Sequence, residues 1–353
     1  MRVGFVAAWM LGLALATACT ADPPETDGDS GTDSDTDTHT DEDTDLDTDT
    51  DVDTDTDVDT DTDEPVPTPI ETDVRNHIFG HSLLLHSDRA NVPRWMAALS
   101  SHAGYRYRMS GQYGFMETHA TNLPPFPQWG VSGVEGLWDE DTGDRFSDVN
   151  VNTVIMTEAN FRQYHPADEV DPDVGGRTTV DSTLAVMGWV DGQEAGVRYV
   201  IYENWPDMAG FTNADFDSRF PSASEMAAYH AETRGDFHDW WVDYQDAVRL
   251  ARPGADVDLI PVGSVMSTVL QGRLADVPVE ALYEDDAPHG TPTLYFLAGL
   301  VTYMGVYGVP APEDYGVPDD VHPIVRARYG DVVDDMWAEL KAFVDEDGNS
   351  RTW

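Results

Sequence analysis

Short apolar runs alternate with longer amphipathic segments along residues 75–353. Runs of about four to eight apolar residues that end at Gly, Pro, Asn or Asp are typical of buried strands. Five runs are predicted to be strands, namely 75–80, 105–109, 151–156, 197–202 and 257–262. Because helical segments separate them, the pattern predicts βαβ units and a mainly parallel, five-stranded sheet with helices on both faces.

The segments between the strands carry apolar side chains at the helical spacing of three or four residues. Helices are predicted from near Pro93 and over 179–190, 222–250, 291–307 and 321–345, with Gly235 as a break in the third of these. Residues 110–148 are rich in Gly, Pro and aromatic residues and are expected to form a long surface excursion. The 279 residues of 75–353 suffice for one sizeable core, so a single three-layer α/β/α domain is expected.

Residues 19–74 show a different pattern. Asp occupies nearly every odd position from Asp27 to Asp63, and Thr occupies most even ones. The period of two resembles that of a strand, but both faces would be polar, and like charges extend such a chain. We therefore predict a disordered acidic linker. Asp-rich calcium loops are an alternative, although no Glu closes a 12-residue loop of the EF-hand type.

Charge divides the chain in the same place. The whole sequence has 67 acidic residues against 19 Lys and Arg, a net charge of -48. Residues 19–74 hold 23 of the acids and no base, whereas residues 75–353 have a net charge of -26. This balance excludes ordinary nucleic-acid binding and docking on anionic lipid through basic patches. It also disfavours polyanionic substrates relative to neutral or cationic ones.

The first 18 residues are expected to direct export. Arg2 precedes an uncharged apolar run, Val3–Ala18, which is too short to span a membrane comfortably and is typical of a signal peptide. The run ends in Leu-Ala-Thr-Ala before Cys19, the one cysteine of the chain, and so resembles a bacterial lipobox. The resemblance implies removal of residues 1–18 and lipid attachment at Cys19. Thr20 in place of Asp is similar to the pattern of outer-membrane lipoproteins; the alternative is a cut that secretes a soluble protein.

Side chains of nucleophilic chemistry follow the predicted strands. Ser82 comes after the first strand, Asn160 after the third, and Asp286 and His289 precede the apolar helix predicted over 291–307. The carboxyl ends of parallel strands meet at one edge of a sheet, where functional groups gather. A serine hydroxyl becomes a nucleophile when a histidine accepts its proton and a carboxylate orients that histidine. N–H donors must then stabilise the oxyanion.

These residues, in this order, resemble the blocks of SGNH (GDSL-type) hydrolases. Ser82 matches the first block, Asn160 the Asn of the GxND block, and Asp286 with His289 the DxxH block. The resemblance implies an SGNH/flavodoxin-like fold and a serine esterase without a cofactor. Ser82 would be the nucleophile, His289 the general base and Asp286 its orienting partner; Asp285 could also face the histidine, but the three-residue spacing of the family favours Asp286. The implied oxyanion donors are the N–H groups of Ser82 and Gly111 and the side-chain amide of Asn160, with Gly114 as the alternative to Gly111.

The sequence also departs from the family pattern. His81 stands where the family usually has Asp or Asn, and Glu158 and Phe161 replace the Gly and Asp of GxND. These departures leave open a catalytically inactive SGNH-like protein that serves binding or adhesion. A metal-dependent hydrolase built on His77, His81 and His86 is a third alternative, although the i, i+4 spacing of the first two suits a helix and this segment is predicted to be a strand and a turn.

We therefore expect a lipid-anchored protein of the bacterial envelope, in the outer membrane, that hydrolyses an ester. O-acyl groups on a polysaccharide are the first expectation for the substrate, by analogy with the family. The expected partners are the ester substrate and the membrane, the latter through the lipid anchor alone. No P-loop and no G-x-G-x-x-G follows a strand, so no nucleotide site is predicted.

Overall fold

The computed structural model describes residues 67–353, apart from 124–129, 140–141, 171–175, 213–214 and 217. The predicted signal peptide, Cys19 and nearly all of the predicted acidic linker lie outside the described residues. The linker was predicted to extend to residue 74, but the first strand already begins at Asp73. The N–H of Ile70 also donates to the carbonyl of Tyr307 at 2.9 Å. The folded domain therefore includes a few residues before 75.

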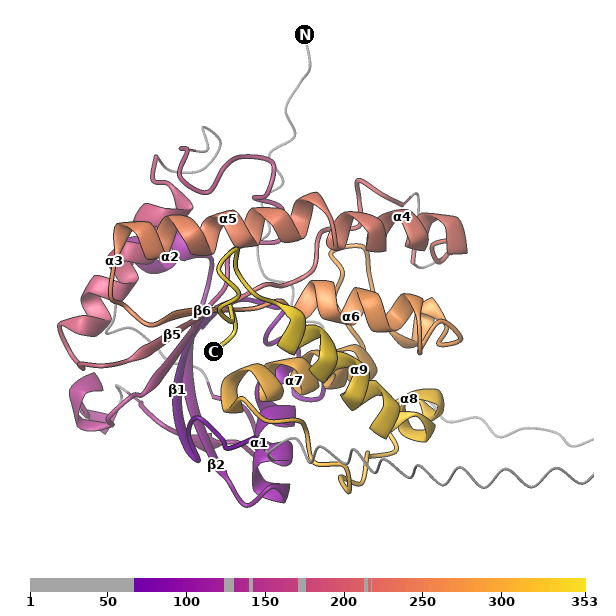
Figure 1. The fold of residues 1–353 in the computed structure, drawn as a ribbon, viewed down its shortest axis with the longest axis horizontal. Helices are drawn as coiled ribbons and strands as arrows, with labels where there is room; N and C mark the ends of the chain where they lie inside the picture. Colours follow the sequence, from indigo (N-terminus) through magenta and orange to yellow (C-terminus); the bar gives the residue numbers. More distant parts are fainter. Residues whose placement is uncertain (1–66, 124–129, 140–141, 171–175, 213–214, 217) are drawn as a thin grey trace, which may run out of the picture. The chain divides into compact units, whose positions relative to one another are not determined.

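Six parallel strands form one sheet in the order β3-β2-β1-β4-β5-β6 (Figure 1). Their bounds are β1 Asp73–Gly80, β2 Arg106–Tyr113, β3 Glu135–Gly136, β4 Thr153–Met156, β5 Arg198–Tyr202 and β6 Val257–Ile260. The five predicted strands are all present, and without β3 their order is that of flavodoxin-like sheets. The predicted total of five is wrong because β3 lies within the excursion of 110–148. Its two exposed residues, paired with Arg108 and Met109, carry no apolar pattern.

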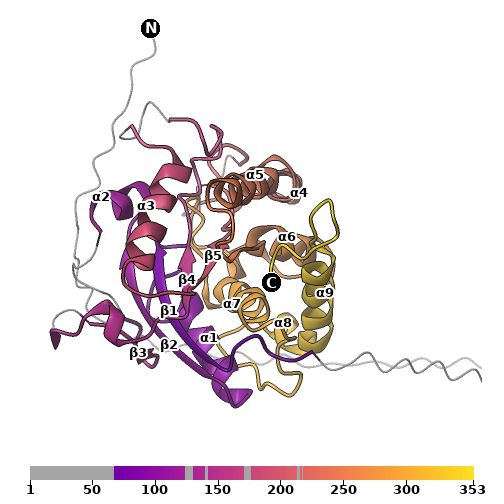
Figure 2. The same ribbon diagram turned by 60° about the vertical axis from the view of Figure 1, so that its left-hand side comes forward.

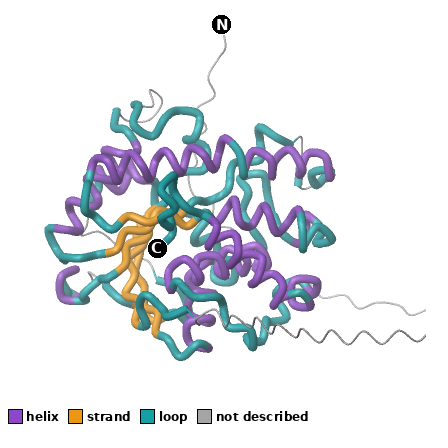
Figure 3. The backbone as a smooth tube through the Cα atoms, in the orientation of Figure 1, coloured by secondary structure: helices purple, strands orange, loops and turns teal. Residues whose placement is uncertain are grey.

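Helices cover both faces of the sheet (Figure 2). One face carries α1 Val92–His102, α6 Val262–Gln271, α7 Pro292–Tyr307 and α9 Tyr329–Ala342, and the other carries α2 Met116–Thr121, α3 Thr179–Asp191 and α5 Asp236–Ala251. The helix α4 Ala223–Thr233 precedes α5 and contacts α6, and the short α8 Pro323–Ala327 precedes α9. Figure 3 shows the loops that join these helices to the strand ends.

Two residues, Gly235 and Arg328, interrupt long helical segments of the sequence. Gly235 separates α4 from α5 as predicted. The single helix predicted over 321–345 is wrong, because Arg328, with φ -112° and ψ 17°, leaves the helical conformation and divides α8 from α9. The apolar periodicity continues across this residue, so the sequence pattern does not reveal the break.

Alternation along the strands builds two cores. Ile78 of β1 and Ile155 of β4 point to the core beneath α1 and α7, whereas Phe79 and Met156 point to the core beneath α3 and α5. All four residues of β4 are buried, as expected for a central parallel strand with helices on both faces. The sheet is thereby fixed on both sides, which gives the loops at its carboxyl edge a rigid base.

The helix α7 is the most buried helix of the first core. Every residue from Thr293 to Tyr307 is buried. Close approach depends on glycine: a Cβ placed on Gly299 would lie 2.5 Å from the Cβ of Trp95 in α1, and one on Gly305 would lie 2.6 Å from the side chain of Ile260 in β6. No helix among the described residues is long and apolar enough to cross a membrane.

Replacing Gly299 with Ala is expected to destabilise the domain. The added methyl group must displace α1 or α7, and overpacking of this kind costs about 1–3 kcal/mol. The matched control is Gly188→Ala in α3, where the new Cβ would meet nothing within 4 Å. That change should stabilise the protein by up to about 1 kcal/mol through helix propensity. Urea unfolding of both variants measures the difference, and equal stabilities would contradict the close packing of α1 against α7.

Candidate active site

Ser82 stands on a tight turn directly after β1. The strand ends at Gly80, and the N–H groups of Leu84 and Leu85 both donate to the carbonyl of His81, at 3.0 and 3.1 Å. This single helical turn leaves Ser82 half-buried at the carboxyl edge of the sheet. The hydroxyl of Tyr295 on α7 donates to the Ser82 carbonyl at 2.6 Å. The turn is therefore fixed from within the core.

His289 reaches Ser82 from a loop that precedes α7. The distance from His289 Nε2 to Ser82 Oγ is 2.8 Å, across 207 positions of sequence. The loop is closed on itself, because the N–H of Glu284 donates to the His289 carbonyl at 2.7 Å and the N–H of Thr291 donates to Leu282 at 2.9 Å. The structure thus brings together the two residues that the sequence singles out as nucleophile and base; their catalytic roles remain a prediction.

The carboxylate beside His289 belongs to Asp285 and not to Asp286. Asp285 Oδ2 lies 2.7 Å from His289 Nδ1, and Asp285 Oδ1 accepts the N–H of His289 at 2.8 Å. Asp286 is exposed, and its carbonyl accepts the N–H of Met208 at 3.0 Å. The predicted pairing of Asp286 with His289 is therefore wrong. The loop turns back between Asp285 and His289. Asp285, four residues before His289, therefore contacts the ring, whereas Asp286, three residues before it, points to solvent.

The contact between Asp285 and His289 sets the charge of the carboxylate and the tautomer of the ring. Burial alone would raise the pKa of Asp285. The hydrogen bonds that it accepts from the His289 ring, the His289 main-chain N–H and the Ala287 N–H outweigh this effect, and they hold the pKa of Asp285 below its usual value. The carboxylate can only accept, so Nδ1 carries the proton and Nε2 is left to accept from the Ser82 hydroxyl. This is the arrangement in which a histidine can remove the proton of a serine.

His81 lies beneath the site and joins two strand ends. Its ring is buried, and its Nε2–H donates to the carbonyl of Glu158, just beyond β4, at 3.0 Å. Burial lowers the pKa of His81 to about 4; the bond to Glu158 opposes this shift, and the nearby His289 adds to it. The ring is therefore neutral near pH 7. It serves as a link between the turn of Ser82 and the loop that carries Asn160.

The three histidines of the metal alternative do not converge. His77 contacts Ser110 Oγ at 2.9 Å, His81 contacts Glu158, and His86 contacts Glu284 at 3.1 Å. Within the ranges that the structure describes, no group of three or more His, Cys, Asp or Glu side chains could hold a metal ion.

Asn160 offers a donor for a developing oxyanion. The residue is only 8 % exposed, and its amide nitrogen is buried without a hydrogen-bond partner among the described residues. Buried amide donors are nearly always paired, so an unpaired one requires an explanation. Asn160 lies on the turn after β4, and its carbonyl accepts the N–H of Asp207 at 3.3 Å.

Neither glycine proposed as a second donor is placed for that role. Gly111 pairs with Ile78 inside the β1–β2 ladder, before β1 ends, so it lies within the sheet and the prediction for Gly111 is wrong. The N–H of Gly114, the alternative, donates to the carbonyl of Gly80 at 2.8 Å. The physical reason is the length of β2, which extends to Tyr113 and not to residue 109 as predicted. The N–H of Ser82 remains a predicted donor.

Two further residues, Asn204 and Trp205, support the site; from the sequence, this run after the fourth predicted strand could line the pocket or form a structural turn. The side-chain amide of Asn204, just after β5, donates to the Glu158 carbonyl at 2.6 Å and to Thr157 Oγ1 at 3.0 Å. Trp205 Nε1 donates to the carbonyl of Pro288, next to His289, at 2.9 Å. Both positions follow β5 at the carboxyl edge of the sheet, and that placement is the sequence signal for either role.

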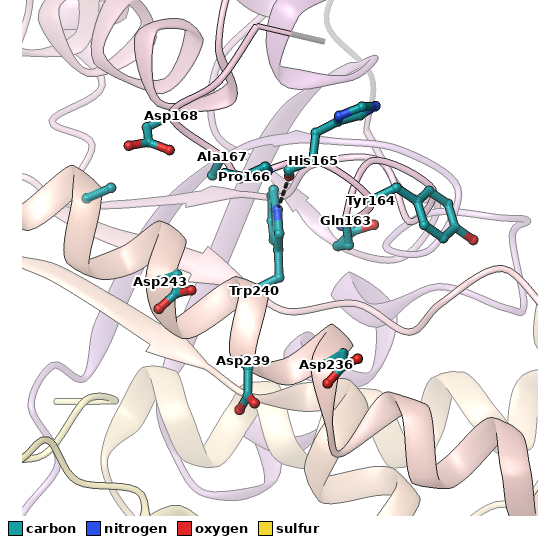
Figure 4. Close-up of a pocket in the computed structure, with 11 residues that line it drawn as sticks. Gln163, Tyr164, His165, Pro166, Ala167, Asp168, Asp236, Asp239, Trp240 and Asp243 are labelled. Atoms are coloured by element: carbon teal, nitrogen blue, oxygen red, sulfur yellow. Dashed lines mark hydrogen bonds between the residues drawn. The ribbon is translucent and has the colours of Figure 1, made fainter.

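A groove of about 580 Å³ lies between the loop 163–168 and α5 (Figure 4). Trp240 Nε1 donates to the His165 carbonyl across it at 2.7 Å. Four carboxylates line it, namely Asp168, Asp236, Asp239 and Asp243. A smaller cavity of about 40 Å³ includes Asn160 and shares Gln163, Tyr164 and Asp236 with the groove. An acidic surface therefore adjoins the surroundings of Asn160.

No protein-family model and no curated protein matches the chain. Among solved structures, the chain is similar to a protein of Slackia heliotrinireducens whose description assigns it provisionally to the SGNH hydrolases. The sequence identity is 18 %, the match covers 65 % of this chain and 97 % of the other, and the TM-score is 0.36. The TM-score is too low for this likeness to assign an activity.

Exchange of each Asp for Asn tests the assignment of the carboxylate. Asp285→Asn is expected to lower kcat for ester hydrolysis by roughly 10³- to 10⁴-fold, because the amide no longer fixes the productive tautomer of His289. The control Asp286→Asn removes a neighbouring exposed charge and should change kcat by no more than about threefold. Steady-state kinetics on one ester substrate measures both, and the reverse order of effects would reject Asp285.

Proposed function

We propose that this protein is a serine esterase of the SGNH type. The observation that carries the proposal is the hydrogen-bonded series Asp285–His289–Ser82, with distances of 2.7 and 2.8 Å. Each group has the orientation that its role requires: the carboxylate accepts from Nδ1, and Nε2 faces the hydroxyl. The series lies at the carboxyl edge of a parallel sheet, where such folds place their chemistry.

The reaction proceeds through an acyl-enzyme. His289 removes the proton of Ser82 as Oγ attacks the ester carbonyl, and Asp285 stabilises the imidazolium that forms. The Asn160 amide and the N–H of Ser82 stabilise the oxyanion. His289 then gives its proton to the leaving alcohol. In the second half, His289 removes a proton from water, the hydroxide attacks the acyl carbon, and the proton returns to Ser82 Oγ as the acid departs.

Glu158, which departs from the family pattern, is compatible with this activity. The Glu158 carboxylate accepts the N–H of Ala159 at 2.7 Å and the hydroxyl of Thr179 at 3.1 Å. Burial raises the pKa of Glu158, and these bonds oppose that shift. Glu158 thus braces the loop that holds Asn160. Its presence in place of Gly removes no group that the reaction uses, which favours the esterase over an inactive binding protein.

The substrate is an ester with a neutral or cationic alcohol, with O-acyl groups on a polysaccharide as the first choice. The acidic groove beside Asn160 supports this charge preference, as does the net charge of -26 over residues 75–353. The location follows from the lipobox-like segment: attachment through Cys19 to the bacterial envelope, in the outer membrane. In this setting the acidic linker holds the domain away from the membrane.

Labelling with a fluorophosphonate tests the nucleophile. The wild-type protein is expected to be labelled at Ser82, and Ser82→Ala should abolish both labelling and ester hydrolysis, because no activated hydroxyl remains. The control Ser87→Ala alters another serine of the same turn region and should be labelled like the wild type. Equal labelling of the Ser82→Ala variant would refute the esterase.

Removal of the Asn160 amide tests the oxyanion donor. Asn160→Ala is expected to lower kcat by roughly 10²- to 10³-fold with little change in KM, because the donor acts on charge that develops in the transition state. Asn122→Ala, at the exposed end of α2, is a control that should leave kcat unchanged. A parallel loss of affinity for the substrate in the Asn160→Ala variant would instead assign the amide to ground-state binding.

Salt dependence tests the preference for charge. The hydrolysis rate of an O-acetylated oligosaccharide that contains uronic acids is expected to rise with ionic strength, because salt screens its repulsion from the acidic domain. The neutral counterpart of the same length should be hydrolysed at a rate that salt hardly changes. Identical salt profiles for the two substrates would contradict the inference from charge.

A further inference from the structure

A second histidine stacks on the ring of His289. The ring centroids of His86 and His289 are 4.2 Å apart, and their planes differ by 15°. His86 has its own carboxylate, since its Nε2–H donates to Glu284 Oε2 at 3.1 Å. Two parallel imidazoles therefore lie face to face, each held by one of two consecutive acidic residues, Glu284 and Asp285.

The local fold makes this arrangement. Ser82 and His86 are four residues apart around the turn after β1, and both reach His289: one by a hydrogen bond and the other by its ring face. The turn continues into a closed loop, because the N–H of His86 donates to the carbonyl of Ala90 at 3.1 Å. On α7, the ring of Tyr295 lies parallel to that of His86, with centroids 6.4 Å apart and planes that differ by 4°.

The stack supplies a restraint that the hydrogen bonds of His289 lack. The lone pair and the N–H of an imidazole point in the plane of the ring, so hydrogen bonds at Nδ1 and Nε2 alone leave the ring free to tilt about the line that joins the two nitrogens. A flat partner in van der Waals contact blocks this tilt on one side. During the acyl-enzyme stage the restraint matters more, because Ser82 Oγ is esterified, carries no proton and no longer donates to Nε2.

We propose that His86 is a positioning residue that holds the ring of His289 in place until water attacks the acyl-enzyme. This inference rests on the proposed esterase function. Before acylation, Asp285, Ser82 and His86 together restrain the ring; after acylation, Asp285 and His86 remain. Loss of His86 must therefore slow deacylation more than acylation. Glu284 takes part by fixing the orientation of His86.

Pre-steady-state kinetics with p-nitrophenyl acetate separates the two halves of the reaction. In His86→Ala, the rate constant of the burst, which reports acylation, is expected to stay within about threefold of the wild type, whereas the steady-state rate falls roughly tenfold because the base is misaligned. In His86→Phe, which keeps a flat ring, the steady-state rate should return to within about threefold. Glu284→Ala should also slow deacylation, but by a smaller factor than His86→Ala.

The matched control is His102→Ala. His102 is also a partly exposed histidine that contacts a carboxylate, Asp314 at 2.8 Å, but it lies at the end of α1. This change should leave both phases unaltered. Equal slowing of acylation and deacylation in His86→Ala would overturn the proposal, as would a Phe variant as slow as the Ala variant. An unchanged steady-state rate in His86→Ala would overturn it too.

A spectroscopic measurement separates failure of this inference from failure of the esterase. The NMR signal of the His289 Cε1–H carries the ring current of His86, so it should shift in His86→Ala and stay in place in His102→Ala. A signal that does not move means that the rings do not stack, and it rejects the inference whatever the activity. A signal that moves in a protein without a burst, and with Ser82 unlabelled by fluorophosphonate, rejects the proposed esterase and with it the role of His86.

Discussion

The bond between Ser82 and His289 depends on α7, because the two residues are 207 positions apart and this helix holds both of the segments that carry them. Tyr295 in the first turns of this buried helix holds the carbonyl of Ser82, and the loop that enters the helix carries His289. Glycine at 299 lets the helix lie against α1, which follows the loop after Ser82. The geometry of the site is therefore a consequence of how one apolar helix packs on the sheet.

Most of the fold follows from the apolar pattern. The five longer strands and the helices α3, α4, α5 and α7 lie close to where the sequence predicts them. The strands and α7 are largely buried apolar runs, and the other three helices bury apolar residues at helical spacing. The failures have physical reasons as well. The strand β3 exists through pairing alone and buries nothing, and the break at Arg328 is a matter of backbone angles that the side chains on either side do not signal.

Part of the candidate site was also predictable, but from residue types and not from apolar periodicity. The types of residue needed for acyl transfer and their places after strands indicate Ser82, His289 and Asn160. The choice between Asp285 and Asp286 depends on the path of a loop closed by main-chain bonds from Glu284 and Thr291, and no side-chain pattern encodes that path. The prediction for Gly111 failed because β2 ends four residues later than predicted, which keeps Gly111 in the ladder.

Two of the three departures from the SGNH blocks, His81 and Glu158, are in contact with each other. His81 donates to the carbonyl of Glu158, and Asn204 donates to the same carbonyl. The Glu158 carboxylate then turns inward to the N–H of Ala159. The bonds from His81 and Asn204 join the ends of β1, β4 and β5 into one unit, and they use the main-chain carbonyl of residue 158, so they do not depend on the side chain at that position. The unit joins the turn of Ser82 to the loop of Asn160, and so it keeps the predicted nucleophile and the predicted oxyanion donor fixed relative to each other, as the proposed reaction requires.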